Sequence, residues 1–396
     1  MTTWYKRLGL APRELKFFAF ASLSMGLAYS IFDSTFNNFL NERYTLNAFQ
    51  RSFIELPREF PGFSVVFVSA LLWFLCSRRL GALSLLLSCA GVLLIGFFSP
   101  TYALMVSFLF IYSLGQHLFM PVASSIGMEL AEPGKTGKRL GQLNAIRNLA
   151  TIGGSFLIFV GFKYMGFTFQ HAFVLSAVGL GVAAILMFSM MPEQNIQPKT
   201  FLKLRREYKL FYLLNVLSGS RKQLFITFAP WVIVTIFKQP TQTLATLMTI
   251  SGVIGIIFQP FLGRMIDKLG ERLVLASEAV LLVFVCLGYG FSKFLLPVSQ
   301  AFIAVSLFYL LDQTLFSVGM ARSMYIKKIA LQPEDVQTAL SAGITIDHLF
   351  SILVALLGGI IWNSFGFQYV FLLGVVIAVI NFFVALQVRI PIMPVP

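Results

Sequence analysis

Charged side chains lie within the long apolar runs of this chain, where a charge is costly. Placing a charged residue at the centre of a bilayer costs about 2.5–3.5 kcal/mol even on a lenient insertion scale, so such residues usually pair or take part in function. Carboxylates in this setting can carry protons, and cations can hold an anionic group. The acidic members are Asp33, Glu55, Glu59, Glu278, Asp312 and Asp347. The basic and titratable members are Arg58, Arg147, Arg221, Lys222, His117 and His348.

The apolar runs themselves predict an integral membrane protein. Of the 396 residues, 57% are hydrophobic and only 12% are charged, and the mean hydropathy is +0.82. A helix that spans a bilayer needs roughly 20 apolar residues, and runs of that length recur along the chain. We therefore expect an all-α integral membrane fold of twelve transmembrane helices. The expected helices cover residues 15–40, 49–75, 81–99, 102–126, 141–161, 171–191, 210–236, 244–262, 273–292, 296–321, 338–362 and 369–388.

The distribution of basic residues predicts how the chain is oriented. Most of the 30 Lys and Arg residues fall in segments that share one side of the membrane in this helix map. Cytoplasmic loops carry such an excess, so both termini are expected in the cytoplasm of a multi-pass protein of the inner or plasma membrane. This orientation also accounts for the net charge of +14 without a nucleic-acid partner.

The sequence also divides into two similar halves. Gln116–Phe119 is echoed by Gln313–Phe316, and Gly166–Phe167 by Gly366–Phe367, at nearly equal offsets. Internal repeats of this kind are common in transporters, so two pseudo-symmetric six-helix bundles are expected. The expected division is an amino-terminal bundle of residues 1–191, a basic cytoplasmic linker of residues 192–209 and a carboxy-terminal bundle of residues 210–396.

Residues 263–272 carry the most specific local pattern, with Gly263, Asp267, Gly270 and Arg272 at fixed spacing between two expected helices. The pattern resembles the G-x-x-x-D-x-x-G-x-R signature of the major facilitator superfamily, and the twelve helices and two halves extend the resemblance to the whole chain. The resemblance implies a latch that closes the cytoplasmic side. Physically, Gly263 would allow close helix approach, and Asp267 would accept hydrogen bonds at a helix N-terminus.

The first half departs from the family pattern at the equivalent position. Aligning Gly81 with Gly270 places Arg78 where Asp267 stands and Phe74 where Gly263 stands, so the amino-terminal latch is degenerate. The drug-exporter signature of the family, which ends in Gly-Pro, is also missing from helix 5. Its absence weakens the interpretation of the chain as a multidrug exporter.

In the superfamily, helices 1, 4, 7 and 10 line a central cavity, and the resemblance places several charged residues there. Asn37 shares a helix face with Asp33 because the two are four residues apart. Arg147 occupies the position in helix 5 that Asp347 occupies in helix 11. The expected substrate or proton site comprises Asp33, Asn37, His117, Arg147, Arg221, Lys222 and Asp312. The alternative is that Arg221 and Asp312 form a static ion pair.

The second expected helix has the features of a bent gating helix. Glu55, Arg58 and Glu59 are spaced by three and four residues, and Pro57 and Pro61 interrupt the backbone hydrogen bonds. By the resemblance, this helix faces helix 11, so Arg58 or Glu59 is expected to meet Asp347 or His348. The alternative is a permanent network within the helix. The expected gating set is Glu55, Arg58, Glu59, Asp347 and His348. Glu278, by contrast, is expected to reach water near a cytoplasmic helix end.

No cofactor or metal is expected, and the chain is not expected to be an enzyme. His117 and His348 have no third ligand at metal-like spacing. The Gly-Lys pairs at Gly134-Lys135 and Gly137-Lys138 lack the preceding strand of a phosphate-binding P-loop. The sequence therefore predicts a monomeric secondary transporter that moves a small organic solute, with protons as the coupling ion.

In this interpretation Asp33 and Asp312 carry protons, and Arg147, Arg221 and Lys222 contact an anionic or zwitterionic group. Export is favoured by its frequency in the family alone. Two alternatives stay open. One is an importer of a charged metabolite, and the other is a sensor or assembly partner that has the same fold but does not transport.

Overall fold

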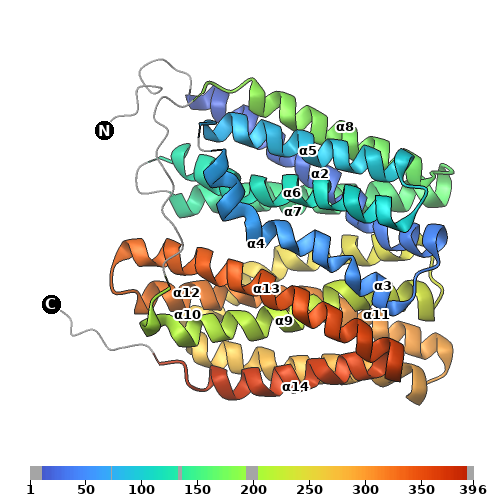
Figure 1. The fold of residues 1–396 in the computed structure, drawn as a ribbon. Helices are drawn as coiled ribbons and strands as arrows, with labels where there is room; N and C mark the ends of the chain where they lie inside the picture. The colour runs from blue at the N-terminus through green and yellow to red at the C-terminus, as the bar shows by residue number, and fades with distance from the viewer. Residues whose placement is uncertain (1–10, 73, 133–135, 193–203, 390–396) are drawn as a thin grey trace. The chain divides into compact units, whose positions relative to one another are not determined.

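The structure is a computed structural model that describes residues 11–72, 74–132, 136–192 and 204–389 (Figure 1). The described residues are mostly helical and contain no β-strand. The all-α class expected from the sequence is therefore confirmed. Helices from the first half of the sequence are α2 (Ala11–Tyr44), α3 (Ala48–Phe53), α4 (Glu55–Leu71), α5 (Ser77–Phe98), α6 (Tyr102–Glu129), α7 (Thr136–Tyr164) and α8 (Phe169–Phe188).

The second half contains five longer helices and several short ones. Its long helices are α9 (Lys209–Trp231), α10 (Thr241–Leu295), α11 (Val298–Leu315), α13 (Pro333–Phe365) and α14 (Phe367–Ala385). The shorter elements are the 3₁₀ turns η1 (Arg206–Tyr208) and η3 (Phe316–Val318), the π-helical η2 (Val232–Ile236) and the helix α12 (Gly319–Ile329).

Nine helices in the described part of the chain are long and apolar enough to cross a membrane. One of them, α10, holds two of the expected spans. The 17-residue α4 and the charged α9 are not among the nine, yet both coincide with expected spans. Each of the twelve segments expected from the sequence thus contains a helix in the part of the chain that the structure describes.

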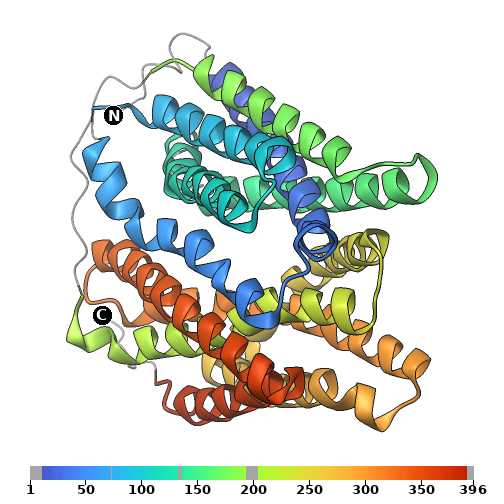
Figure 2. The ribbon, with the colours of Figure 1, turned by 45° about the vertical axis from the view of Figure 1, so that its right-hand side comes forward.

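The chain forms two compact units, of which unit 1 contains Met1–Thr45, Ser64–Thr200 and Pro240–Gly252. Within unit 1, α5 packs against α6 and α8, and α2 packs against α7 and α8 (Figure 2). Glycines allow the close contact of α5 with α6, because a Cβ at Gly91 would overlap Tyr112 and a Cβ at Gly115 would overlap Ser84. Small residues at such contacts are typical of helices packed in a membrane.

Unit 2 contains Leu46–Phe63, Phe201–Gln239 and Val253–Pro396. Within it, α13 packs against α9, α14 and α3. A Cβ at Gly359 of α13 would overlap Ser52 of α3. The backbone of α13 at Gly359 therefore packs directly against the Ser52 side chain. Unit 2 therefore includes residues 46–63 from the first half of the sequence, as unit 1 includes residues 240–252 from the second.

The domain boundaries at residues 191 and 210 stay a prediction. Residues 193–203, which form most of the expected linker, lie outside the described residues. The linker ends at the 3₁₀ turn η1, where the Tyr208 hydroxyl donates to Asp335 over 2.7 Å and Arg205 pairs with the same carboxylate at 3.0 Å. Burial raises the pKa of the Tyr208 phenol, which is consistent with a neutral hydroxyl that acts as a donor.

The structure differs from the sequence prediction at residues 263–272, between the expected helices 8 and 9. The sequence predicts a loop there, whereas α10 runs from Thr241 to Leu295 with a single non-helical residue, Gly270, at φ 79° and ψ 159°. The expected loop is therefore a sharp corner between two helices. Only glycine adopts this backbone region without strain, because a Cβ would clash with its own backbone.

We predict that Gly270→Ala destabilises the protein by about 1–3 kcal/mol, the usual cost of a strained backbone conformation. No described atom lies within 4 Å of a Cβ built at this position, so backbone strain alone should cause the loss. The measurement is thermal unfolding of the purified protein in detergent.

Gly263→Ala is the matched control, since a Cβ at Gly263 also meets no described atom within 4 Å and its backbone is helical. The control should unfold at or above the wild-type temperature, because alanine is the better helix former. Equal unfolding temperatures for Gly270→Ala and the wild type would contradict the prediction.

Candidate functional site

Proline shapes the segment that carries the expected gating residues. The helix is interrupted at Ile54, between α3 and α4, three residues before Pro57. Pro57 has no N–H to donate and its ring clashes with the carbonyl four residues earlier, so a break at this place follows from the sequence. The helix is thus interrupted near Pro57 as expected, whereas α4 runs through Pro61 without a break. Glu55 and Glu59 lie in the first turns of α4, and the bent gating helix stays a prediction.

Glu55 joins the first turn of α4 to α9 in unit 2. Its Oε1 accepts from the Arg51 guanidinium at 2.7 Å, and both side chains are fully buried. Its Oε2 accepts from the Gln223 amide of α9 at 3.0 Å. Arg51 also lies over the Trp231 ring, 5.9 Å from the ring centroid. Because the Arg51 and Glu55 side chains are fully buried, these bonds are costly to break.

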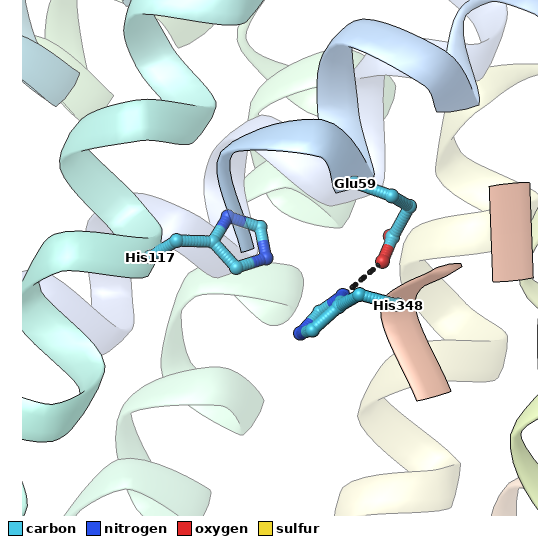
Figure 3. Close-up of side chains that lie close together, drawn as sticks. All are labelled: Glu59, His117 and His348. Carbon is cyan, nitrogen blue, oxygen red and sulfur yellow. Dashed lines mark hydrogen bonds and ion pairs between the residues drawn. The ribbon is translucent and has the colours of Figure 1, made fainter. Parts of the chain in front are cut away.

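Glu59 and His348 form the second link of this segment to the rest of unit 2. Figure 3 shows the Glu59 carboxylate of α4 aimed at the His348 ring of α13, and Oε2 lies 2.6 Å from Nδ1. This is one of the pairings that the sequence predicts. The gating role of the two residues stays a prediction. Arg58 lies half-buried on the same helix.

Arg221 and Asp312 form the most deeply buried ion pair of the expected substrate site. Arg221 on α9 donates through Nη1 to Asp312 Oδ1 on α11, and their side chains are 3% and 0% exposed. The guanidinium also lies over the rings of Phe225 and Phe316. Asp312 Oδ2 has no hydrogen-bond partner among the described residues, and neither has Arg221 Nε.

Glu278 contradicts one expectation from the sequence. It does not reach water near a helix end but is 2% exposed. Its Oε2 lies 3.5 Å from Nη1 of Arg322 on α12, which satisfies the carboxylate inside the protein. Glu278 is also close enough to Arg221 and Asp312 for their charges to interact. Unit 2 thus buries a cluster of two acids and two bases with no net charge.

Lys222 pairs with Asp347 rather than standing alone as a cation. Its Nζ lies 3.2 Å from Oδ2 of Asp347 on α13. A Cβ at Gly219 would overlap Asp347 Oδ1, so the absence of a side chain there makes room for the carboxylate. The Lys222 and Asp347 side chains are 36% and 17% exposed, far more than the Arg221 and Asp312 pair.

The remaining members of the expected substrate site belong to unit 1. Asp33 is half-buried and Asn37 is buried, both on α2. His117 on α6 is 8% exposed, and its Nδ1 lies 2.9 Å from the Ser113 carbonyl oxygen. Arg147 on α7 is exposed, and no acidic side chain forms an ion pair with it within the described ranges. The expected set is therefore distributed over both units.

The latch residues lie around the corner of α10. Asp267 and Arg272 are exposed, and the close helix approach expected at Gly263 is not seen, because a Cβ there would meet no described atom within 4 Å. The buried charge at this corner is instead Glu271, which is 0% exposed and lies 2.6 Å from Lys328 Nζ.

Arg78 stands at the equivalent position of the first half, and its charge is compensated locally. It is 1% exposed and forms two hydrogen bonds to Glu129, at 2.8 and 3.0 Å. Glu14 lies 3.9 Å away on α2. Bidentate arginine–carboxylate pairs are among the stronger ion pairs in proteins, so the degenerate latch position is a fixed charge cluster within unit 1.

Sequence reasoning missed the partners Gln223, Gly219 and Arg322. Gln223 directly follows Arg221 and Lys222, and three successive polar residues in an expected span were a usable signal. Arg322 lies just beyond the span expected to end at residue 321, whereas the helical structure continues through α12 to Ile329. Nothing in the spacing pointed to Gly219.

Part of the sequence resembles a known protein family. Residues 211–394 match the sequence model of the Major Facilitator Superfamily. No curated protein sequence matches the chain significantly.

Three solved structures illustrate the likeness in fold. The nucleoside transporter NupG is 12% identical, with a TM-score of 0.73 over 95% of this chain and 98% of that chain. A D-xylose-proton symporter is 15% identical, with a TM-score of 0.66 over 93% and 96%. An auto-inhibited POT family peptide transporter is 11% identical, with a TM-score of 0.75 over 97% and 99%. At these identities the likeness establishes the fold alone.

We predict that Asp312→Ala destabilises the protein by about 3–5 kcal/mol, because it leaves the Arg221 guanidinium buried without its counter-ion. The double variant Arg221→Met with Asp312→Leu should recover most of the loss, since an apolar pair carries no uncompensated charge.

Thermal unfolding in detergent measures both variants. Equal stability of Asp312→Ala and the wild type would mean that water reaches Arg221 and that the pair is not the closed contact described above.

Proposed function

We propose that this chain, whose residues 211–394 match the Major Facilitator Superfamily, is a member of that superfamily and a secondary active transporter that moves a small organic solute by alternating access with coupled proton movement. The observation that carries the proposal is the buried pair of Arg221 and Asp312, with Glu278 and Arg322 beside it. Ionisable groups inside membrane-spanning helices are rare, and they commonly mark substrate and proton pathways.

Asp312 has the arrangement that a proton carrier needs. One carboxylate oxygen accepts from Arg221, and the other, Oδ2, has no hydrogen-bond partner in the described part of the chain. A proton bound at Oδ2 would neutralise the carboxylate and weaken its hold on the guanidinium. Arg221 would then need another anionic partner, because an unpaired buried cation is costly.

Proton binding and solute binding are linked by this exchange of partners. A solute with an anionic group can replace Asp312 beside Arg221, and release of the proton restores the original pair. The charge of the buried cluster stays balanced in both states. Such reciprocal dependence of two ligands on one another is the thermodynamic basis of coupled transport.

Residues of unit 1 are proposed to complete the solute pathway. Asp33 is retained as the second proton carrier, with Asn37 on the same face of α2. His117 offers a titratable ring. Arg147 is exposed and forms no ion pair within the described ranges, so its guanidinium is open to an anionic group.

Residues 46–63 are proposed to act as the gate. They attach to unit 2 through Glu55 with Gln223 and through Glu59 with His348, and they belong by sequence to the other half of the chain. Alternating access in this superfamily moves the two halves past one another, so these contacts would have to form and break during the cycle. Arg58 and Asp347 lie beside them. Gly263, Asp267, Gly270 and Arg272 are proposed as the cytoplasmic latch.

The membrane topology, the oligomeric state and the direction of transport are also proposed. The chain is a multi-pass membrane protein, and we propose that both termini face the cytoplasm of the inner or plasma membrane and that a monomer is functional. Export is the proposed direction. An importer of a charged metabolite would use the same residues, whereas a non-transporting sensor would show no solute flux.

We predict that Asp312→Asn abolishes coupled proton movement, because an amide cannot take up the proton. Purified protein is reconstituted in liposomes that contain a trapped pH-sensitive dye. The liposomes are exposed to four solute pools in turn: a pool of amino acids, a pool of carboxylates, a pool of amines, and a pool of uncharged sugars and nucleosides. At least one pool should change the internal pH with the wild type.

The matched control is Asp335→Asn, which alters a buried carboxylate of the same unit that lies outside the proposed pathway. It should retain the response that Asp312→Asn loses. An absence of any response from the wild type, with the protein correctly folded, would favour the non-transporting alternative.

A further inference from the structure

The Lys222–Asp347 pair is far more exposed than the Arg221–Asp312 pair of the same unit. Its side chains are 36% and 17% exposed, against 3% and 0% for Arg221 and Asp312. Charges within membrane spans face a bundle interior or a water-filled cavity rather than acyl chains. A solute dissolved in that water can therefore reach Lys222 and Asp347 while the Arg221–Asp312 pair is closed, and it reaches Arg221 only after protonation of Asp312 has opened that pair.

We infer that Lys222 and Asp347 form the recognition site for a small zwitterion, with Lys222 binding a carboxylate and Asp347 binding an ammonium group. The inference rests on the proposed transport function and assigns its substrate class. It also gives Asp347 a binding role in place of the gating role expected from the sequence.

The local geometry leaves both charged groups with unused bonding capacity. An ammonium group has three donors, and the structure records one acceptor for Lys222, the Oδ2 atom of Asp347. Asp347 Oδ1 has no hydrogen-bond partner among the described residues. It rests against Gly219, where a side chain would overlap it. This buried oxygen can accept from a second donor when the carboxylate turns away from Gly219, as it would when Lys222 exchanges Oδ2 for the solute carboxylate.

Charge balance selects a zwitterion over a solute with one charge. When the pair opens for a carboxylate alone, Lys222 gains a partner but Asp347 loses its own, and an amine alone has the converse effect. Leaving either charge unpaired in a partly dehydrated site is costly. A zwitterion replaces one ion pair by two and leaves neither charge unpaired.

Neighbouring charges in unit 2 do not disturb this balance. His348, the next residue on α13, faces Glu59 at 2.6 Å. Arg221, the preceding residue on α9, faces Asp312. Arg322 on α12, whose charge also acts on Asp347, faces Glu278 at 3.5 Å. Since these neighbours have partners of their own, the site offers one positive and one negative group.

The first part of the test compares matched solutes on the purified full-length protein. Each amino acid is compared with the carboxylate and the amine that lack one of its two charged groups. L-alanine is compared with propionate and ethylamine, and L-leucine with 4-methylpentanoate and 3-methylbutylamine. L-phenylalanine is compared with 3-phenylpropionate and 2-phenylethylamine. Dissociation constants are obtained from ligand-dependent thermal stabilisation. At least one amino acid should bind, and at least about tenfold more tightly than both of its singly charged analogues, as expected for the loss of one charged contact.

The second part uses variants that remove one charge at a time. Asp347→Asn should weaken amino-acid binding at least tenfold and make the carboxylate the better ligand, and Lys222→Gln should make the amine the better ligand. Gly219→Ala keeps both charges but displaces the Asp347 carboxylate, so it should also weaken the amino acid. Asp335→Asn should bind as the wild type does. These opposite changes in preference separate a binding role from a general loss of stability.

Either of two results would overturn the inference: no amino acid binds, or a singly charged analogue binds the wild type as tightly as its amino acid. The solute pools in liposomes then distinguish the two proposals. A proton response to the carboxylate or uncharged pool alone would leave the transport function standing and reject the zwitterion site, whereas no response to any pool would reject transport itself.

Discussion

A charge between membrane-spanning helices needs an opposite charge or water beside it, and unit 2 is organised around this constraint. Arg221 meets Asp312, Arg322 meets Glu278, Lys222 meets Asp347 and His348 meets Glu59. Each pair joins two different helices, so the compensation of charge also determines which helices stay together. Removing one partner would cost several kcal/mol, which is comparable with the whole stability of many proteins.

The same pairs provide the means for change. An ion pair can exchange its partner for a proton or for a solute group without leaving a bare charge, whereas an apolar contact has no such exchange. The pairs differ in how far they are exposed, and this difference suggests separate tasks. The closed pair of Arg221 and Asp312 suits proton coupling, and the open pair of Lys222 and Asp347 suits solute recognition. Glu55 and Glu59 hold the α3–α4 segment by the same kind of contact.

Sequence patterns predicted the fold because hydropathy and length are properties of each helix by itself. Each of the twelve expected segments contains a helix in the described part of the chain, and the break before Pro57 follows from the chemistry of one residue. The pairing of Glu59 with His348 was foreseen because the family resemblance placed two helices face to face. Glu278 was misplaced, since its partner Arg322 lies on a helix whose continuation to Ile329 the hydropathy pattern did not reveal. Gly219 could not be predicted, because its importance depends on a carboxylate 128 residues away in the sequence.

The central claim is that Asp312 alternates between an ionised partner of Arg221 and a protonated, unpaired acid. Infrared difference spectroscopy of the reconstituted protein measures the protonation of Asp312 directly through the carboxyl stretching band. Spectra are recorded between neutral and acidic pH and with an active solute pool. The account predicts a band of protonated carboxylic acid that appears with solute and acid and is absent from Asp312→Asn. A spectrum in which the wild type and Asp312→Asn give the same bands would contradict it, and would make the pair a fixed structural element.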